Sequence, residues 1–198
     1  MTIFGYLIIT FWAVLFAVWI LGALTAKRTA RANRWLAWAY RVVFAIIVFL
    51  VFRMLALCRW LHEPAAVAHG HLLQTNPFWG AIGTLVALSG ISLAISARLT
   101  LGRNWGMPMI ERIEPELVTH GVYAYVRHPI YAGFILGMLG SALGESIIWL
   151  IPLATSVPYF LYSAKREEKL MLRIFPDRYP AYLAHTRGFL PRFRWQNG

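Results

Sequence analysis

Long apolar runs dominate the pattern of hydrophobic and polar positions along this chain. They lie at roughly residues 2–24, 36–58, 78–97 and 130–162. At about 1.5 Å of rise per helical residue, each run can cross the roughly 30 Å hydrocarbon core of a bilayer. The pattern therefore predicts an all-α integral membrane protein.

The last apolar run is long enough to cross a membrane twice. Gly140, Gly144 and Glu145 interrupt it near its middle, and Pro152 and Pro158 follow. These residues predict two short helices joined by a tight turn. The expected total is five transmembrane helices, the last two forming a helical hairpin.

Composition agrees with lipid as the solvent. Of the 198 residues, 59% are hydrophobic and 14% are charged, which is far from the balance of a soluble domain. The single cysteine, Cys58, excludes an internal disulfide, and its place at the end of an apolar run indicates packing.

A net charge of +11 raises the question of nucleic acid, and the placement of the basic residues answers it. Lys27, Arg28, Arg31 and Arg34 follow the first run, Arg98, Arg103, Arg112 and Arg127 follow the third, and eight more lie between Lys165 and Arg194. Basic residues concentrate on the cytoplasmic side of membrane proteins. We therefore expect no nucleic-acid partner, an inner (plasma) membrane location, an outward N-terminus and a cytoplasmic C-terminus.

The first apolar run resembles a signal peptide in length. No basic residue precedes it and four follow it, so we expect it to be retained. The loop after the second run carries His62, Glu63, His69 and His71. These residues lack the helical i, i+4 spacing or the partner cysteines of a metal site, so we predict no bound metal.

The first motif with chemical content spans residues 121–133, directly before the fourth run. Pro129 suits the first turn of a helix, because its missing N–H would be unpaired there. Arg127 and His128 then lie at a helix start, which favours a carboxylate or phosphate. Alternatively, they mark a membrane boundary, where basic residues are common.

A second motif, Lys165 to Leu170, follows the last run and contains the adjacent carboxylates Glu167 and Glu168. One of them could hold a cation. Alternatively, this charged stretch, which runs from Ser163 to Phe175, is an ordinary surface helix with Glu–Lys pairing.

Over residues 100–192 the chain resembles the isoprenylcysteine carboxyl methyltransferases and the related phospholipid methyltransferases. The resemblance rests on Gly102-Arg103-Asn104-Trp105, residues 117–123, Arg127-His128-Pro129-Ile130-Tyr131-Ala132-Gly133, Glu167-Glu168 with Phe175, and Gly188-Phe189-Leu190-Pro191. It implies a single membrane domain over residues 1–198. Within that domain, residues 1–98 would hold three transmembrane helices, and residues 99–198 a cofactor-binding region that includes the hairpin at about 130–162.

The resemblance also implies an S-adenosylmethionine site at the cytoplasmic membrane surface. The implied cofactor-binding residues are Leu117, Val118, Tyr123, His128, Pro129, Ile130, Tyr131 and Glu167. The implied catalytic residues are Arg127, Glu167 and Glu168. The cofactor carboxylate suits the helix start with His128, its ammonium suits Glu167, and a tyrosine face suits its sulfonium.

The methyl acceptor is less constrained. It would be a lipophilic molecule from the bilayer, bordered by Asn104, Trp105, Ser163 and Arg166. The resemblance implies an arginine four residues before the first glutamate to hold a prenylcysteine carboxylate, and this chain has Ser163 there. A serine cannot form the bidentate fork of arginine, so a carboxylate, an amine and a thiol stay open as acceptors.

Two other classes of function stay open. Sterol reductases are similar in the same region and use NADPH, although no G-x-G-x-x-G loop is present here. A non-enzymatic membrane scaffold or permease-like protein is the other. The sequence does not fix the oligomeric state.

Overall fold

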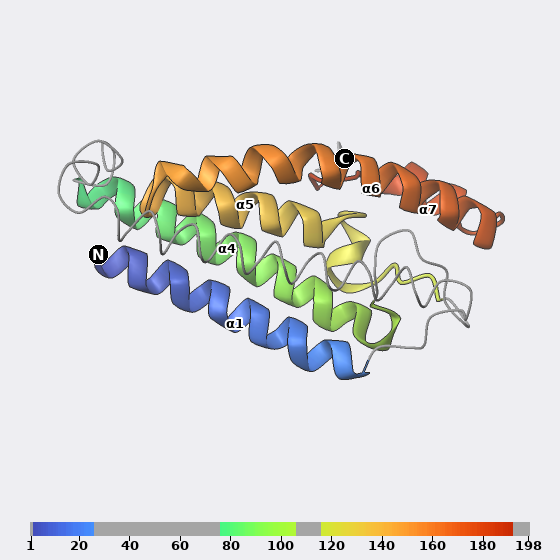
Figure 1. Cartoon of the computed structure of the whole chain (residues 1–198). Helices are drawn as coiled ribbons and strands as arrows, with labels where there is room; N and C mark the ends of the chain where they lie inside the picture. Colours follow the sequence, from blue (N-terminus) through green and yellow to red (C-terminus); the bar gives the residue numbers. More distant parts are fainter. Residues whose placement is uncertain (1, 26–75, 106–115, 192–198) are drawn as a thin grey trace, which may run out of the picture.

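The computed structural model describes residues 2–25, 76–105 and 116–191. The predicted second helix (36–58), the histidine-bearing loop and Cys58 lie outside the described residues. The helices are α1 (Ile3–Thr25), α4 (Pro77–Leu101), α5 (Pro129–Gly144), α6 (Leu150–Ile174) and α7 (Tyr179–His185), with the short 3-10 turns η2 (Gly102–Asn104), η3 (Gly121–Ala124) and η4 (Ile147–Trp149). Figure 1 shows α1, α4, α5 and α6 side by side, with α7 near the C-terminal end of α6.

Within the described residues, three helical segments are long and apolar enough to cross a membrane: Ile3–Gly22, Pro77–Asn104 and Ile147–Ile174. Large apolar side chains cover their outer surfaces, among them Ile3, Ile20, Leu85 and Ile151, each more than half exposed. A surface of this kind is stable in lipid and not in water. The chain is an integral membrane protein.

The long apolar run from 130 to 162 forms two helices, as predicted. Helix α5 ends at Gly144, and η4 leads into α6. The charged stretch from Ser163 to Phe175 is helical as predicted, but it is the last part of α6, which continues through Pro158 to Ile174. It stops where Phe175 precedes Pro176, because the residue before a proline disfavours the helical conformation.

Glycines set the contact between α4 and α5. A Cβ atom on Gly140 would lie 2.2 Å from the backbone N of Ala87, and one on Gly83 would lie 2.2 Å from the backbone N of Gly144. Such separations are possible only without side chains, so the two backbones pack directly together. This face of α5 therefore packs against α4, although α6 is its neighbour in the hairpin.

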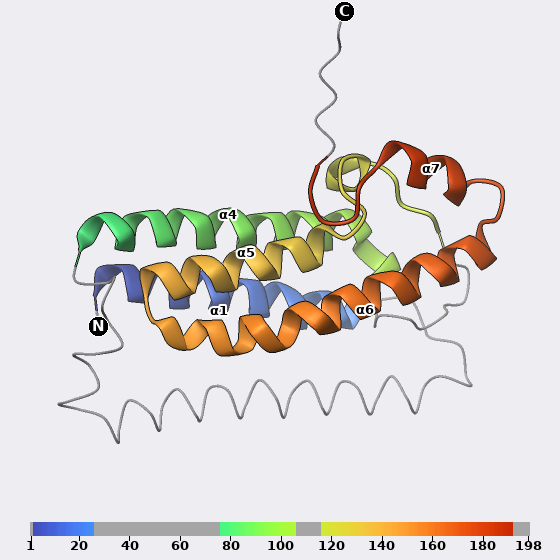
Figure 2. The same cartoon turned by 90° about the horizontal axis from the view of Figure 1, so that it is seen from above.

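The neighbours of α1 fix the direction of the helices. Phe4 packs at Gly80, whereas Gly22 packs at Arg98, so α1 and α4 run parallel. Helix α5 runs against both, and α6 returns with them (Figure 2). The C-terminal ends of α1, α4 and α6 and the start of α5 therefore share one end of the bundle.

Candidate functional site

The predicted site residues converge at this shared end. His128 directly precedes α5, and Glu167 and Glu168 lie two turns before the end of α6. Their side chains are between buried and half-buried, with 5% of the His128 side chain and 28% of the Glu167 side chain exposed. The two motifs therefore form one cluster, although some 40 residues separate them.

Glu168 binds the two cationic side chains at the start of α5. Its Oε1 accepts a hydrogen bond from Nε of Arg127 at 2.8 Å and lies 3.1 Å from Nε2 of His128. Charge-assisted hydrogen bonds of this length are strong, particularly where the side chains are mostly shielded from solvent. Glu168 therefore holds α6 to the start of α5.

Glu167 has a different environment. Its Oε1 accepts a hydrogen bond from the hydroxyl of Tyr131, and its Oε2 lies 3.5 Å from Nδ1 of His128. A separation of 3.5 Å is at the outer limit of a hydrogen bond, so Oε2 keeps capacity to accept another donor. The ring of Tyr131 stacks on Phe160 of α6 at 4.9 Å between centroids, which fixes the position of its hydroxyl.

A C-terminal segment covers the start of α5. The backbone N–H groups of Arg127 and His128 donate to the carbonyls of Arg187 and Gly188, each at 2.9 Å. The Arg127 guanidinium also donates to the carbonyl of Thr186. Sequence reasoning noted Gly188 to Pro191 as a motif without a role, and missed that the preceding carbonyls hold Arg127.

His128 and Tyr182 lie outside the apolar helices, and each has a raised pKa. Burial disfavours the charged imidazole of His128, but hydrogen bonds to Glu167 and Glu168 outweigh it and raise the pKa of His128. Burial raises the pKa of Tyr182 to about 12. The Tyr182 hydroxyl donates to the carbonyl of Tyr123 at 2.6 Å, which joins α7 to η3.

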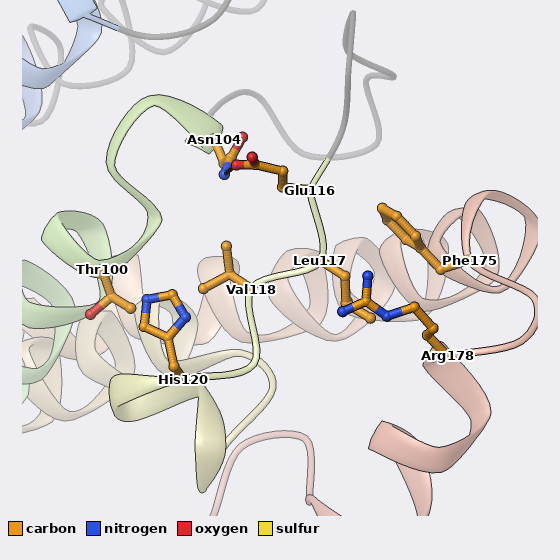
Figure 3. A pocket seen from close by; sticks show the side chains of 8 residues that line it. All are labelled: Thr100, Asn104, Glu116, Leu117, Val118, His120, Phe175 and Arg178. Atoms are coloured by element: carbon orange, nitrogen blue, oxygen red, sulfur yellow. Dashed lines mark hydrogen bonds between the residues drawn. The ribbon is translucent and has the colours of Figure 1, made fainter.

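A hollow of about 440 Å³ lies between the C-terminal end of α4 and the residues that follow α6, at the same end of the bundle as the cluster; its lining does not include the cluster residues. It is lined by Thr100, Asn104, Glu116, Leu117, Val118, His120, Phe175 and Arg178. Figure 3 shows Leu117 and Val118 on one loop segment, with Asn104 on one side of it and Phe175 and Arg178 on the other. Sequence reasoning named Leu117, Val118 and Asn104 as site residues. It assigned no role to the other residues that line the hollow.

The remaining predicted residues take varied positions. Tyr123 is buried in η3, Pro129 and Ile130 begin α5, and Arg166 is exposed on α6. Trp105 lies against Arg98, away from the hollow's lining. Ser163 is fully buried, and its hydroxyl has no hydrogen-bond partner among the described residues. Within the same residues, no group of three or more side chains is arranged to hold a metal ion.

The bundle of apolar helices defines an integral membrane protein, and its cluster of charged side chains at one end is the candidate site. Residues 78–178 match the family described as phospholipid methyltransferase. The chain belongs to this family.

Two curated proteins are similar in sequence to parts of this chain. The nickel-cobalt-cadmium resistance protein NccN of Alcaligenes xylosoxydans xylosoxydans is 33% identical over 64% of this chain and 58% of its own length. The protein-S-isoprenylcysteine O-methyltransferase of Schizosaccharomyces pombe is 38% identical over 38% of this chain and 33% of its own length.

A solved structure shares the fold. It is that of the eukaryotic intramembrane Ras methyltransferase, isoprenylcysteine carboxyl methyltransferase, with a TM-score of 0.58 and 24% identity. The match covers 71% of this chain and 52% of that one. The chain therefore spans less than two thirds of the length of each of these relatives.

Proposed function

We propose that this chain is a methyltransferase that uses S-adenosylmethionine to methylate a carboxylate on a lipophilic acceptor drawn from the bilayer. One observation carries the proposal: Glu167 keeps capacity to accept a further donor beside His128, at the end of the bundle that also holds a hollow lined by Leu117 and Val118. Membership of the phospholipid methyltransferase family and the names of several relatives support it.

The residues at the site fit the cofactor. S-adenosylmethionine would supply an electrophilic methyl group on a sulfonium. The free oxygen of Glu167 suits the cofactor's ammonium, and the aliphatic side chains of Leu117 and Val118 suit its adenosine. His128, Pro129, Ile130 and Tyr131 form the start of α5, and a helix start favours a carboxylate.

The protonation state of the cluster favours a carboxylate acceptor. An amine or thiol must lose a proton before it attacks, whereas a carboxylate needs no base. His128 has a raised pKa and lies between two carboxylates, so it tends to keep its proton. Arg127 and Glu168 neutralise one another. Methylation of a phospholipid amine or of a small thiol is the alternative.

The structure supports a topology for the proposed enzyme. We propose five transmembrane helices, of which α1, α4, α5 and α6 lie among the described residues, and the parallel course of α1 and α4 is in keeping with that count. The site lies at the end where Arg98, Arg103 and Arg127 gather. We therefore place this end in the cytoplasm and the N-terminus outside an inner (plasma) membrane.

Thermal melting of the purified full chain in detergent tests the proposal. S-adenosylhomocysteine should raise the melting temperature, and NADPH should not. Glu167→Gln should abolish the shift. Glu145→Gln is the matched control, since Glu145 lies at the opposite end of α5, where it accepts a hydrogen bond from Trp149. A shift with NADPH alone, or an undiminished shift in Glu167→Gln, would refute it.

A further inference from the structure

Arg98 is a buried cation with most of its donors unpaired. Its residue is 3% exposed, inside a helix that is apolar enough to cross a membrane. Nη1 donates to the carbonyl of Gly102 at 2.9 Å. Among the described residues, nothing accepts from Nε or Nη2. An ionised side chain in this position is expensive without a partner, so it points to a ligand.

The two free atoms form one edge of the guanidinium. Nε and Nη2 present parallel N–H groups, which is the geometry that binds two oxygens of a carboxylate or phosphate. Trp105 covers the face of the guanidinium, with its ring centroid 4.4 Å from Cζ. The guanidinium is therefore held in one orientation while its Nε/Nη2 edge keeps its donors.

Gly22 of α1 packs directly against this side of the guanidinium. A Cβ atom at position 22 would lie 2.1 Å from Nη2 and 2.9 Å from Nε of Arg98. Any side chain there would displace the guanidinium or cover its donors. A glycine at this position is therefore what an anion-binding edge between α1 and α4 requires.

Arg98 is connected to the proposed transfer site. Arg98 is in the last turn of α4, at the same end of the bundle as the start of α5. A series of aromatic contacts also leads from Trp105 through Trp19, Phe134 and Phe160 to Tyr131, whose hydroxyl binds Glu167. Apolar rings thus link the cation to the cluster, as suits a molecule with an anionic group and a hydrophobic body.

We propose that Arg98 binds the anionic group, a carboxylate or a phosphate, of the lipophilic methyl acceptor through its Nε/Nη2 edge. This inference rests on the proposed function and narrows it. It supplies the bidentate cation that Ser163 does not offer. Lys would keep the charge and lose the paired donors, so the site should distinguish Arg from Lys.

Binding of three radiolabelled probes to the full chain in phosphatidylcholine nanodiscs tests this. The probes are hexadecanoate, hexadecyl phosphate and the uncharged hexadecanol. Wild-type protein should bind one or both anions and not the alcohol, and the preferred anion identifies the acceptor's group. Arg98→Gln and Gly22→Ala should weaken anion binding by at least about tenfold, and Arg98→Lys should also weaken it. Arg173→Gln, an exposed arginine on α6, is the control with the same charge change.

Separate readouts keep the two proposals distinguishable. If wild-type protein does not bind S-adenosylhomocysteine, the proposed function is refuted. If Arg98→Gln binds the anions as tightly as wild type, this inference is refuted. A purely structural Arg98 predicts a lower melting temperature for Arg98→Gln without any effect of the anion on wild-type stability. That result would also overturn it, as would equally tight binding of bulk phosphatidylglycerol.

Discussion

Glu167 and Glu168 are adjacent in sequence but differ in what their carboxylates contact. Glu168 binds Arg127 and His128, whereas Glu167 keeps an oxygen for a further donor. Glu168→Gln should therefore destabilise the fold by about 1–3 kcal/mol, since two cations lose a charged partner. Glu167→Gln should lower affinity for S-adenosylhomocysteine with little effect on stability. Denaturation in mixed micelles and calorimetric binding separate the two, and a reversed pattern would contradict the assignment.

The raised pKa of His128 predicts how the stability of the protein depends on pH. Its pKa is raised in the folded protein by the two glutamates, so its contribution to stability is fully present below the unfolded value of about 6.5. That contribution is lost as pH rises through the folded pKa. Melting temperatures measured from pH 6 to about pH 9 should therefore fall more steeply for wild type than for His128→Gln. Parallel pH profiles would show that His128 does not carry the effect.

At the residue scale, the sequence predicts the site in part. His128 comes just before the last apolar run and Glu167 just after it. If that run crosses the membrane twice, both residues lie on the same side, and the structure places their side chains 3.5 Å apart. It does not predict the division of labour between Glu167 and Glu168, which depends on side-chain distances. Nor does it separate the buried Arg98 from the other basic residues at membrane boundaries, since burial is a property of the packed helices.

At the scale of elements, the glycines of α5 differ in what a side chain at each position would meet. A Cβ on Gly140 would meet the backbone of Ala87 at 2.2 Å, whereas a Cβ on Gly137 would meet the Trp12 side chain at 3.2 Å. Gly140→Ala should therefore destabilise the protein by at least the 1–3 kcal/mol or so of an overpacked core, and Gly137→Ala by less. Melting temperatures of the two variants in one detergent measure the difference, and equal losses would contradict direct backbone packing.

Spacing in the sequence predicts small residues on α5 but not which helix they face. A hairpin brings α5 and α6 together, so α6 is the natural expectation. The answer lies in the complementary glycines of α4, Gly83 and Gly90, which meet α5 from a distant part of the chain. The continuity of α6 was missed for a related reason. A change from apolar to charged composition suggests a boundary, yet a helix that leaves the membrane can continue through it.

At the scale of the whole molecule, the C-terminal segment of residues 186–191 packs on the candidate site. Ending the chain after His185 removes the carbonyls of Thr186, Arg187 and Gly188 that hold Arg127 and His128. This truncation should lower the melting temperature and weaken S-adenosylhomocysteine binding. Ending the chain after Pro191 leaves every one of these hydrogen bonds in place and serves as the control. Equal binding by both truncated proteins would show that the segment does not support the site.

Orientation in the membrane gives the last prediction. Substituting Cys58→Ser provides a background without cysteine, to which Ile147→Cys in the turn before α6 or Asp177→Cys after it can be added. Ile147 precedes the first residue of α6 and Asp177 follows its last, so the two positions flank opposite ends of this helix. Because basic residues gather at the end that carries Asp177, an impermeant maleimide should label Ile147→Cys in intact cells and Asp177→Cys in inverted vesicles. Labelling of Asp177→Cys from outside would place the site on the wrong face for a cytoplasmic cofactor.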